Sequence, residues 1–426
     1  MDVTEIRRDF PILNQEGKPL VYLDNGATTQ KPQAVIDRLC RYYSMENSNI
    51  HRGSYPLSSQ ASRMYERARE TVRSWVDAEY GEEIVFTKGC TESVNLAAAA
   101  VFETYVCPGD NVIVTELEHS SNYFPWKNQC EKKCAQFRVA LAQTDGSLRA
   151  EDVLDQMDSR TRLIAVTAMS NVTGFCPDVD RIIREAHKRG VLVLIDAAQA
   201  VVHRAISVRQ MKCDFLCFSG HKIYGPMGIG VLYGRKMYLE EMAPYLYGGD
   251  MVVKGDRGEV SYKKSPSKYE AGTQDIAGAL GLEAALLYLN SRGFEEMIQY
   301  EAELGAYLRE RLEAVKGVHV IGEPAVRQPL SGRSDPQPQS GGSVPQPQSG
   351  GSPIALFETD KLGAYDIGVL LANSGIAVRS GSHCAYPLMK RMGKESLCRV
   401  SLSFYNTKQE IEYMAERLER ICGRGS

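Results

Sequence analysis

Residues Phe218–Pro226 have the sequence Phe-Ser-Gly-His-Lys-Ile-Tyr-Gly-Pro, and the apolar run Phe215–Phe218 leads into them. The run predicts a buried β-strand, and the glycines and the proline that follow predict a turn directly after it. Lys222 therefore falls at a strand end among polar groups, where a lysine that forms a Schiff base is expected. A single lysine in a loop is more often a plain surface residue, so the rest of the chain decides between the two interpretations.

Further strands are predicted upstream, where runs of β-branched residues and leucine occur. These runs are Ile84–Phe86, Asn111–Thr115, Leu163–Thr167 and Val191–Ile195. They are hydrophobic throughout rather than at alternate positions, which is typical of a parallel sheet covered on both faces. Helices are predicted around them at 58–77, 94–105, 178–189 and 277–291. This alternation predicts an α/β domain with a mainly parallel sheet and crossover helices.

A second, smaller α+β domain is expected from about Gly293 onward. Its predicted elements are an amphipathic helix carrying Leu304, Leu308 and Leu312, strands at 318–321, 354–357 and 376–378, a helix at 365–373, and a last helix. Thr407 and Glu410 have the spacing of a capping box at the start of that last helix. We therefore predict a large domain of residues 20–292 and a small domain that combines residues 1–19 with 293–426.

A low-complexity insert, residues 331–353, interrupts the predicted small domain. Within it the stretch Pro336–Ser343, Pro-Gln-Pro-Gln-Ser-Gly-Gly-Ser, is repeated as Pro345–Ser352. A segment of this composition cannot build a hydrophobic core, so we expect a tolerated loop insertion that carries no chemistry. An arm that binds a partner is the alternative.

The chain of 426 residues has a formal net charge of -3. That balance indicates no nucleic-acid-binding surface, and no apolar run is long enough to span a membrane. Residues 1–5 lack the layout of a signal peptide, so we expect a cytoplasmic protein with free thiols at its eleven cysteines. Cys130 and Cys134 are interpreted as two thiols on one helix face, because nothing nearby completes a zinc site. No metal site is predicted.

Five polar residues fall at the carboxyl ends of the predicted strands. They are Thr91, His119, Asn171, Asp196 and Lys222. Ligands of open α/β sheets bind at those ends, so the five residues together predict a site where each alone would mean little. The glycine and small polar residues before the helix at 94–105 suit a phosphate, although Thr91 could equally be an ordinary helix N-cap.

Six motifs together resemble the class V aminotransferase-like cysteine desulfurases, enzymes of fold type I that use pyridoxal 5'-phosphate. The motifs are Leu23–Thr29 (Leu-Asp-Asn-Gly-Ala-Thr-Thr), His51–Gly53, Glu118–Asn122, Asp196–Gln199, Ser219–Lys222 and Arg379–Ala385. Within that family the chain resembles the SufS and CsdA type, group II. The resemblance covers essentially the whole length apart from the insert.

The resemblance implies a role for each candidate residue in binding cofactor and substrate. Lys222 would form a Schiff base with pyridoxal phosphate and later move the α-proton of the substrate, while His119 would stack on the cofactor ring. The other implied cofactor contacts are Asp196 to the ring nitrogen, Gln199 to the phenolic oxygen, and Thr91, Ser219 and His221 to the phosphate, with the backbone of Cys90 beside them and Thr273 joining from the second subunit of a homodimer. Asn171, next to the cofactor, would surround the substrate carboxylate with Arg379 and Arg399, since guanidinium groups suit carboxylates.

Cys384 is the residue that would make such a protein a desulfurase. In the resembling family its counterpart attacks the substrate sulfur as a thiolate and becomes a persulfide, leaving alanine as the product. Arg379 and His383 could favour the thiolate. A buried structural cysteine is the usual alternative, but Cys384 follows a predicted strand in a loop that contains glycine and serine.

Three positions depart from the pattern of the resembling family. Gly26 replaces a usual alanine, Cys90 a common threonine and Ser382 a common histidine. The missing hydroxyl at position 90 puts one side-chain phosphate contact in doubt and leaves the backbone N–H groups in place. None of the three removes a catalytic atom.

The resemblance predicts a cytoplasmic homodimer that acts on L-cysteine in iron–sulfur cluster assembly and passes sulfur to a SufE- or SufU-like acceptor. A selenocysteine lyase is the nearest alternative, because carbon–chalcogen cleavage serves both substrates. An aminotransferase or kynureninase-like hydrolase would need no thiol at Cys384. The non-enzyme alternative is a cofactor-free scaffold or a thiol-rich metal-binding protein.

Overall fold

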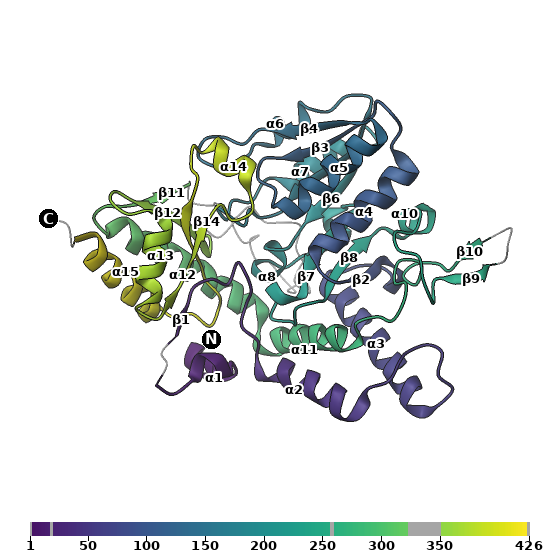
Figure 1. The fold of residues 1–426 in the computed structure, drawn as a ribbon, viewed down its shortest axis with the longest axis horizontal. Coiled ribbons are helices and arrows are strands. Elements are labelled where there is room, and N and C mark those ends of the chain that lie inside the picture. Colours follow the sequence, from purple (N-terminus) through teal and green to yellow (C-terminus); the bar gives the residue numbers. More distant parts are fainter. Residues whose placement is uncertain (1, 18–19, 256–259, 323–350, 424–426) are drawn as a thin grey trace, which may run out of the picture.

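The computed structural model describes residues 2–17, 20–255, 260–322 and 351–423. Two main sheets lie side by side in it, with the C-terminal helices on the outer side of the smaller one (Figure 1). Most of the repeated segment of the insert falls outside the described residues, so its prediction stays untested.

The larger sheet has seven strands and holds the predicted parallel core. Their spatial order is β2 (Ile84–Thr87), β8 (Gly230–Gly234), β7 (Phe215–Ser219), β6 (Leu192–Asp196), β5 (Thr161–Thr167), β3 (Asn111–Thr115) and β4 (Gln136–Ala140). Strands β7, β6, β5, β3 and β4 are parallel to one another, which confirms the predicted α/β class. Strands β4 and β8 were not predicted.

Strand β8 runs antiparallel to both of its neighbours, β2 and β7. The connection from β7 to β8 is the turn that carries Lys222. A parallel crossover needs a dozen or more residues, so this shorter connection returns the chain antiparallel. The turn therefore lies at the carboxyl end of β7 and not on a crossover helix.

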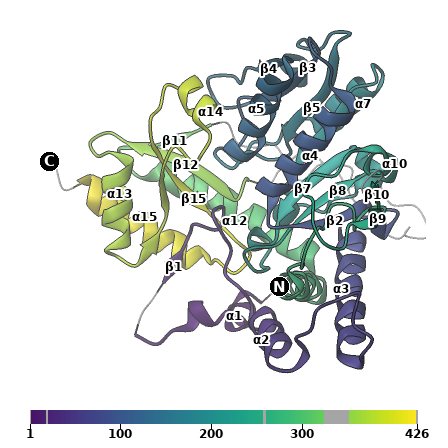
Figure 2. The ribbon, with the colours of Figure 1, turned by 45° about the vertical axis from the view of Figure 1, so that its right-hand side comes forward.

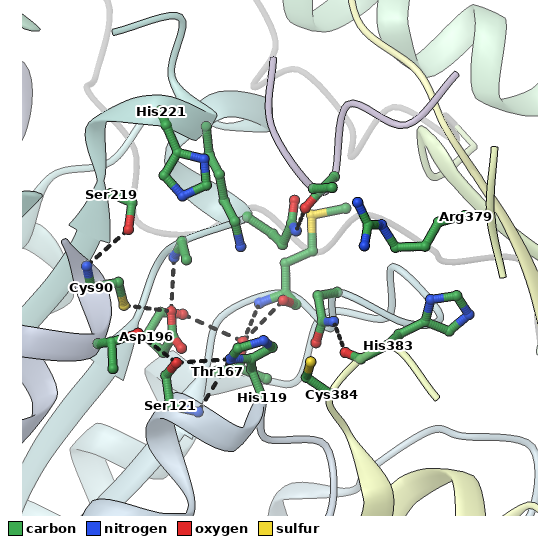
Figure 3. A pocket seen from close by; sticks show the side chains of 18 of the residues that line it. Cys90, His119, Ser121, Thr167, Asp196, Ser219, His221, Arg379, His383 and Cys384 are labelled. Carbon is green, nitrogen blue, oxygen red and sulfur yellow. Dashed lines mark hydrogen bonds between the residues drawn. The ribbon is translucent and has the colours of Figure 1, made fainter. Parts of the chain in front are cut away.

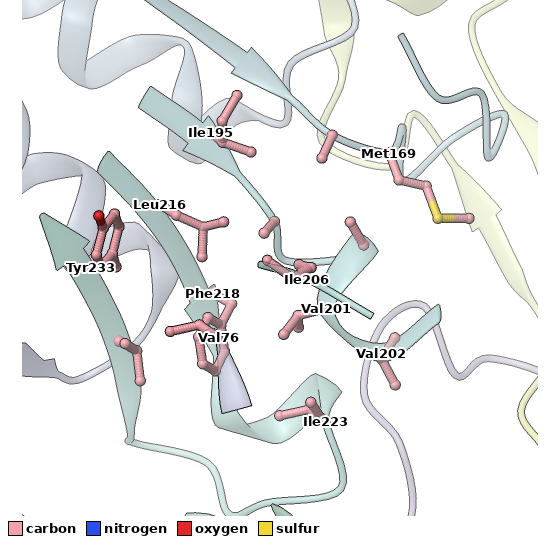
Figure 4. Close-up of a cluster of buried hydrophobic side chains, with 14 of the residues drawn as sticks. Val76, Met169, Ile195, Val201, Val202, Ile206, Leu216, Phe218, Ile223 and Tyr233 are labelled. Carbon is pink, nitrogen blue, oxygen red and sulfur yellow. The ribbon is translucent and has the colours of Figure 1, made fainter. Parts of the chain in front are cut away.

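Helices cover both faces of the larger sheet, as the continuous hydrophobic runs predicted (Figure 2). Four helices pack on the two faces: α3 (Pro56–Trp75), α4 (Cys90–Tyr105), α5 (Phe124–Lys133) and α11 (Ile276–Arg292). Along β7, Leu216 and Phe218 point to the side of α3 and α11, where Ile195 and Val201 pack with them (Figure 4). Phe215 and Cys217 point to the opposite side, toward α4 and α5. Alternate strand residues thus serve two different cores.

Helix α4 begins at Cys90, four residues before the predicted start at Val94. Its N-cap is Gly89, and the polar residues after it form the first helical turn. Thr91 is therefore not the N-cap, the alternative considered for it; its hydroxyl instead pairs with that of Ser121 at 2.7 Å. Helix α5 ends at Lys133, which leaves Cys134 exposed beyond it in a left-handed conformation. Only Cys130 is on the helix, so the predicted pair of helix-face thiols is wrong.

The smaller sheet has four antiparallel strands, in the order β11 (Val318–Ile321), β12 (Ile354–Thr359), β15 (Leu397–Ser401) and β14 (Arg379–Gly381). Its core also includes helices α12 (Phe294–Ala314), α13 (Ala364–Ala372) and α15 (Lys408–Gly423). The capping box is confirmed: the Glu410 N–H donates to the Thr407 hydroxyl at 3.2 Å, and the Glu410 carboxylate accepts from the Thr407 N–H at 3.0 Å.

The N-terminal segment contacts both main sheets. Strand β1 (Val21–Tyr22) pairs in parallel with β13 (Ile376–Ala377), and Leu23 is buried in the core of the smaller sheet. Phe10 packs against Tyr224 on one side and Phe404 on the other. The predicted division into residues 20–292 and the remainder stays a prediction.

The remaining described helices and strands are short or peripheral. They are α1 (Val3–Arg8), α2 (Gln33–Arg41), α6 (Ala150–Leu154), α7 (Val179–His187), α8 (Ala200–His203), α9 (Val208–Met211), α10 (Lys236–Glu241), α14 (Tyr386–Arg391), β9 (Val252–Gly255) and β10 (Val260–Tyr262). Within the described ranges, no helix combines the length and hydrophobicity needed to cross a membrane.

Candidate active site

A cavity of about 290 Å³ opens at the carboxyl ends of the parallel strands, and residues of both main sheets line it (Figure 3). It brings together all of the predicted site residues except Thr273: Cys90, Thr91, His119, Asn171, Asp196, Gln199, Ser219, His221, Lys222, Arg379, Cys384 and Arg399. The strand-end argument therefore located the cavity, while the roles of the individual residues stay predictions.

Lys222 ends a 3₁₀ turn, Gly220–Lys222, directly after β7. A loop of the N-terminal segment holds this turn, because the carbonyl of His221 accepts hydrogen bonds from the hydroxyl of Thr29 at 3.1 Å and from Nζ of Lys31 at 2.8 Å. Burial lowers the pKa of Lys222, and the nearby Asp196 carboxylate partly offsets that effect. A neutral amine is the form that attacks a carbonyl carbon.

The first turn of α4 forms one end of the cavity. The N–H of Cys90 donates to the hydroxyl of Ser219 at 2.8 Å, and a Cβ on Gly230 would lie 2.4 Å from Cα of Gly89. Only glycine at position 230 lets the start of the helix approach β8 this closely. Backbone N–H groups at the start of a helix of this length, together with nearby hydroxyls, suit a phosphate. His221 beside them has a buried Nδ1 with no hydrogen-bond partner in the described chain.

A buried acid, Asp196, lies at the end of β6. Its Oδ1 accepts hydrogen bonds from the N–H of Ala198 at 2.9 Å and from Sγ of Cys90 at 3.5 Å. His119 faces the same cavity, and burial lowers its pKa. Because its Nδ1 accepts from the N–H of Ser121 at 3.1 Å, the imidazole is neutral. The buried carboxylate of Asp196 and the neutral ring of His119 together suit a flat heterocycle with a basic nitrogen.

Two arginines of the smaller sheet share one carboxylate, that of Asp24. Arg399 is buried and donates to Asp24 at 3.1 Å and to the carbonyl of Asn171 at 2.8 Å, while Arg379 reaches Asp24 at 2.8 Å. Nε of Arg399 is buried and has no hydrogen-bond partner among the described residues. Because two guanidinium groups face a single carboxylate, a net positive charge remains that can attract a further carboxylate.

Cys384 is exposed to the cavity and has a positive φ of 55°, as does His383 before it at 53°. Such a backbone costs on the order of 1–3 kcal/mol per residue unless its surroundings hold it. Here the segments that follow β5 and β3 hold it: Nδ2 of Asn171 donates to the carbonyl of His383 at 2.8 Å, and Ser120 donates to the carbonyl of Cys384. The loop is therefore anchored across the boundary between the two sheets.

The prediction that His383 favours the thiolate form of Cys384 is wrong. The ring of His383 is buried and turned away from the thiol, and its Nε2 donates to the carbonyl of Leu397 at 3.1 Å (Figure 3). Burial, with the charge of Arg399, lowers its pKa to about 3. A neutral imidazole supplies no positive charge, so Arg379 is the remaining candidate.

The model of the family described as aminotransferase class-V matches residues 21–332 and 340–414. The chain belongs to this family. Within it, the chain is 41% identical to a cysteine desulfurase of Pectobacterium atrosepticum, with 98% of each chain covered. It is 39% identical to a probable cysteine desulfurase of Halalkalibacterium halodurans, over 99% of this chain and 98% of the relative. The sequence motifs thus identified the class-V family correctly.

Solved structures agree with this family assignment. The cysteine desulfurase CsdA of Escherichia coli, in an S-sulfonic acid form, has a TM-score of 0.86 at 33% identity, with 99% of this chain and 98% of that chain covered. The apo cysteine desulfurase of Thermococcus onnurineus has a TM-score of 0.88 at 30% identity, with the same coverage. The predicted fold class and the likeness to the CsdA type are confirmed.

Thr273 does not line this class-V cavity. It lies in a separate hollow of the described chain, with Thr87, Glu92 and Tyr269. The prediction placed Thr273 in the site of a second subunit, so its location in its own chain neither supports nor contradicts that role.

Sequence reasoning missed two residues that organise the class-V site. Asp24 neutralises part of the arginine charge, and Ser120 anchors the Cys384 loop. Both were inside quoted motifs but received no role. The apolar run Leu20–Leu23 predicts a short strand, and Asp24 directly follows it, so the strand-end rule could have found Asp24. Ser120 has no such signal, because its contact joins segments 264 positions apart.

Proposed function

We propose that this protein is a cysteine desulfurase that converts L-cysteine to L-alanine and transfers the sulfur to Cys384, with pyridoxal 5'-phosphate as cofactor. The observation that carries the proposal is that Lys222 and Cys384, which come from the two different sheets, line one cavity. An aminotransferase would need the lysine but not the exposed thiol.

The residues of the cavity fit pyridoxal phosphate. The first turn of α4 and Ser219 suit its phosphate, Asp196 suits its ring nitrogen, and Lys222 is the amine that would hold its aldehyde carbon. His119 would stack on the ring. When bound, the cofactor supplies an electron-accepting ring that stabilises negative charge on the α-carbon of the substrate.

The side chains would divide the remaining work. Arg399 and Arg379, with Asn171, bind the substrate carboxylate and orient it, while the lowered pKa of Lys222 suits it to move the α-proton. Sγ of Cys384, as thiolate, forms a bond to the substrate sulfur as the carbon–sulfur bond breaks, and the electron pair of that bond stays with the carbon. Protonation of that carbon gives alanine, and the persulfide stays on Cys384.

The biological setting belongs to the same proposal. We infer a homodimer in which Thr273 of the partner subunit completes the phosphate site, a cytoplasmic location, and transfer of sulfur to a SufE- or SufU-like protein for iron–sulfur cluster assembly. Selenocysteine is the alternative substrate, because the same carbon–chalcogen cleavage would serve both amino acids.

Two variants test the proposed function. Cys384→Ser should keep the visible absorption band of the bound cofactor and lose sulfide release from L-cysteine, while Lys222→Ala should lose that band. Alanine and sulfide are measured in the same reaction, with a reductant present. The proposal would be refuted if Cys384→Ser released sulfide at an undiminished rate. It would also be refuted if the parent protein gained no visible band with pyridoxal phosphate.

A further inference from the structure

Three potential metal ligands meet at the floor of the cavity: Cys90, Asp196 and Cys217, all buried. Sγ of Cys90 lies 3.4 Å from Sγ of Cys217 and 3.5 Å from Oδ1 of Asp196. We propose that these three side chains bind one thiophilic divalent cation, Zn²⁺ or Cd²⁺, when the protein lacks its organic cofactor. The cation would occupy the acid that the proposed cofactor needs.

The fold holds these three ligands in place with short, regular contacts. Asp196 and Cys217 are directly opposite each other in the parallel pair β6 and β7, and the N–H of Ala197 donates to the carbonyl of Cys217 at 2.9 Å. Cys90 arrives from the other direction, at the start of α4, because Gly230 admits Gly89 against β8. Cys217 points to the α4 side of the sheet, so both sulfurs face each other.

The spacing of the ligand atoms matches a tetrahedral site. Zinc binds sulfur at about 2.3 Å and carboxylate oxygen at about 2.1 Å, which places two sulfurs about 3.8 Å apart and a sulfur and an oxygen about 3.6 Å apart. The observed separations, 3.4 Å and 3.5 Å, differ from those edges by a few tenths of an ångström. Small side-chain rotations would therefore complete the coordination.

Charge balance and access also permit a cation. Binding breaks two S–H bonds and releases both protons to the solvent, so two thiolates and one carboxylate surround the dication. Cys90 and Asp196 line the cavity, which gives the ion a path and leaves its fourth coordination position facing that space.

Such a site makes the metal and the cofactor compete. The oxygen of Asp196 that binds the metal belongs to the carboxylate that pairs with the cofactor ring, a step that rests on the proposed function. Zinc loading of newly made protein would then delay its conversion to the holoenzyme. No local pattern indicates this site, because Cys90 and Cys217 are 127 positions apart.

A cadmium titration tests the site itself. The protein is freed of cofactor by dialysis against hydroxylamine, in a Cys384→Ser background that removes the exposed cavity thiol. Cd²⁺ is added, and the ultraviolet thiolate-to-cadmium charge-transfer band is recorded. We expect one tight equivalent, lost in Cys217→Ser and kept in Cys213→Ser, which removes a buried thiol outside the cluster. An equal band in Cys217→Ser, or no tight equivalent in the parent, overturns the proposal.

A second measurement tests the competition. Cadmium-loaded protein is mixed with pyridoxal phosphate, and the visible band of the bound cofactor is followed. The band should form only after a chelator is added, whereas Cys217→Ser should form it at once with or without Cd²⁺. Equal band formation with and without Cd²⁺ in the parent overturns the sharing of Asp196. A metal-free parent that never forms the band would instead contradict the proposed function, so the two failures are distinguishable.

Discussion

Ser120 donates two hydrogen bonds to the carbonyl of Cys384, one from its backbone N–H at 2.8 Å and one from its hydroxyl at 2.7 Å. His119, the proposed ring-stacking residue, is its immediate neighbour in the chain. The position of the exposed thiol is thus tied to the position of His119 through a single serine. This relationship bears on how the thiol reaches the substrate sulfur.

Ser120→Ala should slow sulfide release from L-cysteine about fivefold and leave the visible cofactor band unchanged. One of the two bonds is lost, worth about 1 kcal/mol, and the strained loop at Cys384 then samples other conformations. The rate of Cys384 alkylation by iodoacetamide should change as well, which is measured without substrate. Ser291→Ala is the control, because its hydroxyl also bonds a carbonyl at 2.8 Å but lies outside the cavity. Equal turnover in both variants would refute the anchoring role.

Arg399→Lys should raise KM for L-cysteine about 10- to 100-fold. Arg399 holds Asp24 and the carbonyl of Asn171 at once, and a lysine ammonium cannot reproduce that fork, worth about 1.5–3 kcal/mol. Arg379→Lys, at a half-exposed position, should raise KM less. Steady-state kinetics on both variants measure the difference. The reverse order of the two effects would contradict the assignment of Arg399 as the main carboxylate ligand.

Gly230→Ala should weaken cofactor binding and lower the thermal unfolding midpoint. The added Cβ meets Cα of Gly89 at 2.4 Å, so the start of α4 must move away from β8, at a cost of about 1–3 kcal/mol. Cofactor affinity is measured from the visible band at increasing pyridoxal phosphate. Gly81→Ala is the matched control, since a Cβ there meets nothing within 4 Å. An unchanged affinity in Gly230→Ala would show that this close approach does not shape the phosphate site.

The free energy of unfolding of Lys31→Met, relative to that of the parent, should be higher at pH 7 than at pH 9. Burial lowers the pKa of Lys31 to about 7, from an ordinary value of 10.5. Between those values the unfolded chain binds a proton that the folded chain lacks, so the parent gains stability as pH rises through this range. The variant lacks this gain, which amounts to about 2 kcal/mol between pH 7 and 9. Thermal unfolding midpoints of both proteins at the two pH values give the comparison. A difference between variant and parent that does not vary with pH would mean that Lys31 titrates normally in the folded protein.

Much of this architecture was predictable because it depends on local pattern. The run Asn111–Thr115 has the strand bounds that were predicted, since continuous β-branched segments are typical of a sheet covered on both faces. Strand β4 was missed because it is an edge strand with partly exposed residues and no continuous apolar run. Strand β8 was also missed; it is the strand at which the sheet changes from parallel to antiparallel pairing.

The amino-acid sequence alone determined the family, the α/β class and the set of residues that meet at the strand ends, because hydrophobic runs and short motifs are local properties of the chain. Only the tertiary structure decided that Asp24 is shared by two arginines, that His383 is neutral, that Ser120 anchors Cys384 and that Cys90 faces Cys217. Each of these depends on the register of paired strands, on burial, or on a close backbone approach such as that of Gly89 to Gly230. Those distances arise between segments far apart in the chain, so no local pattern encodes them.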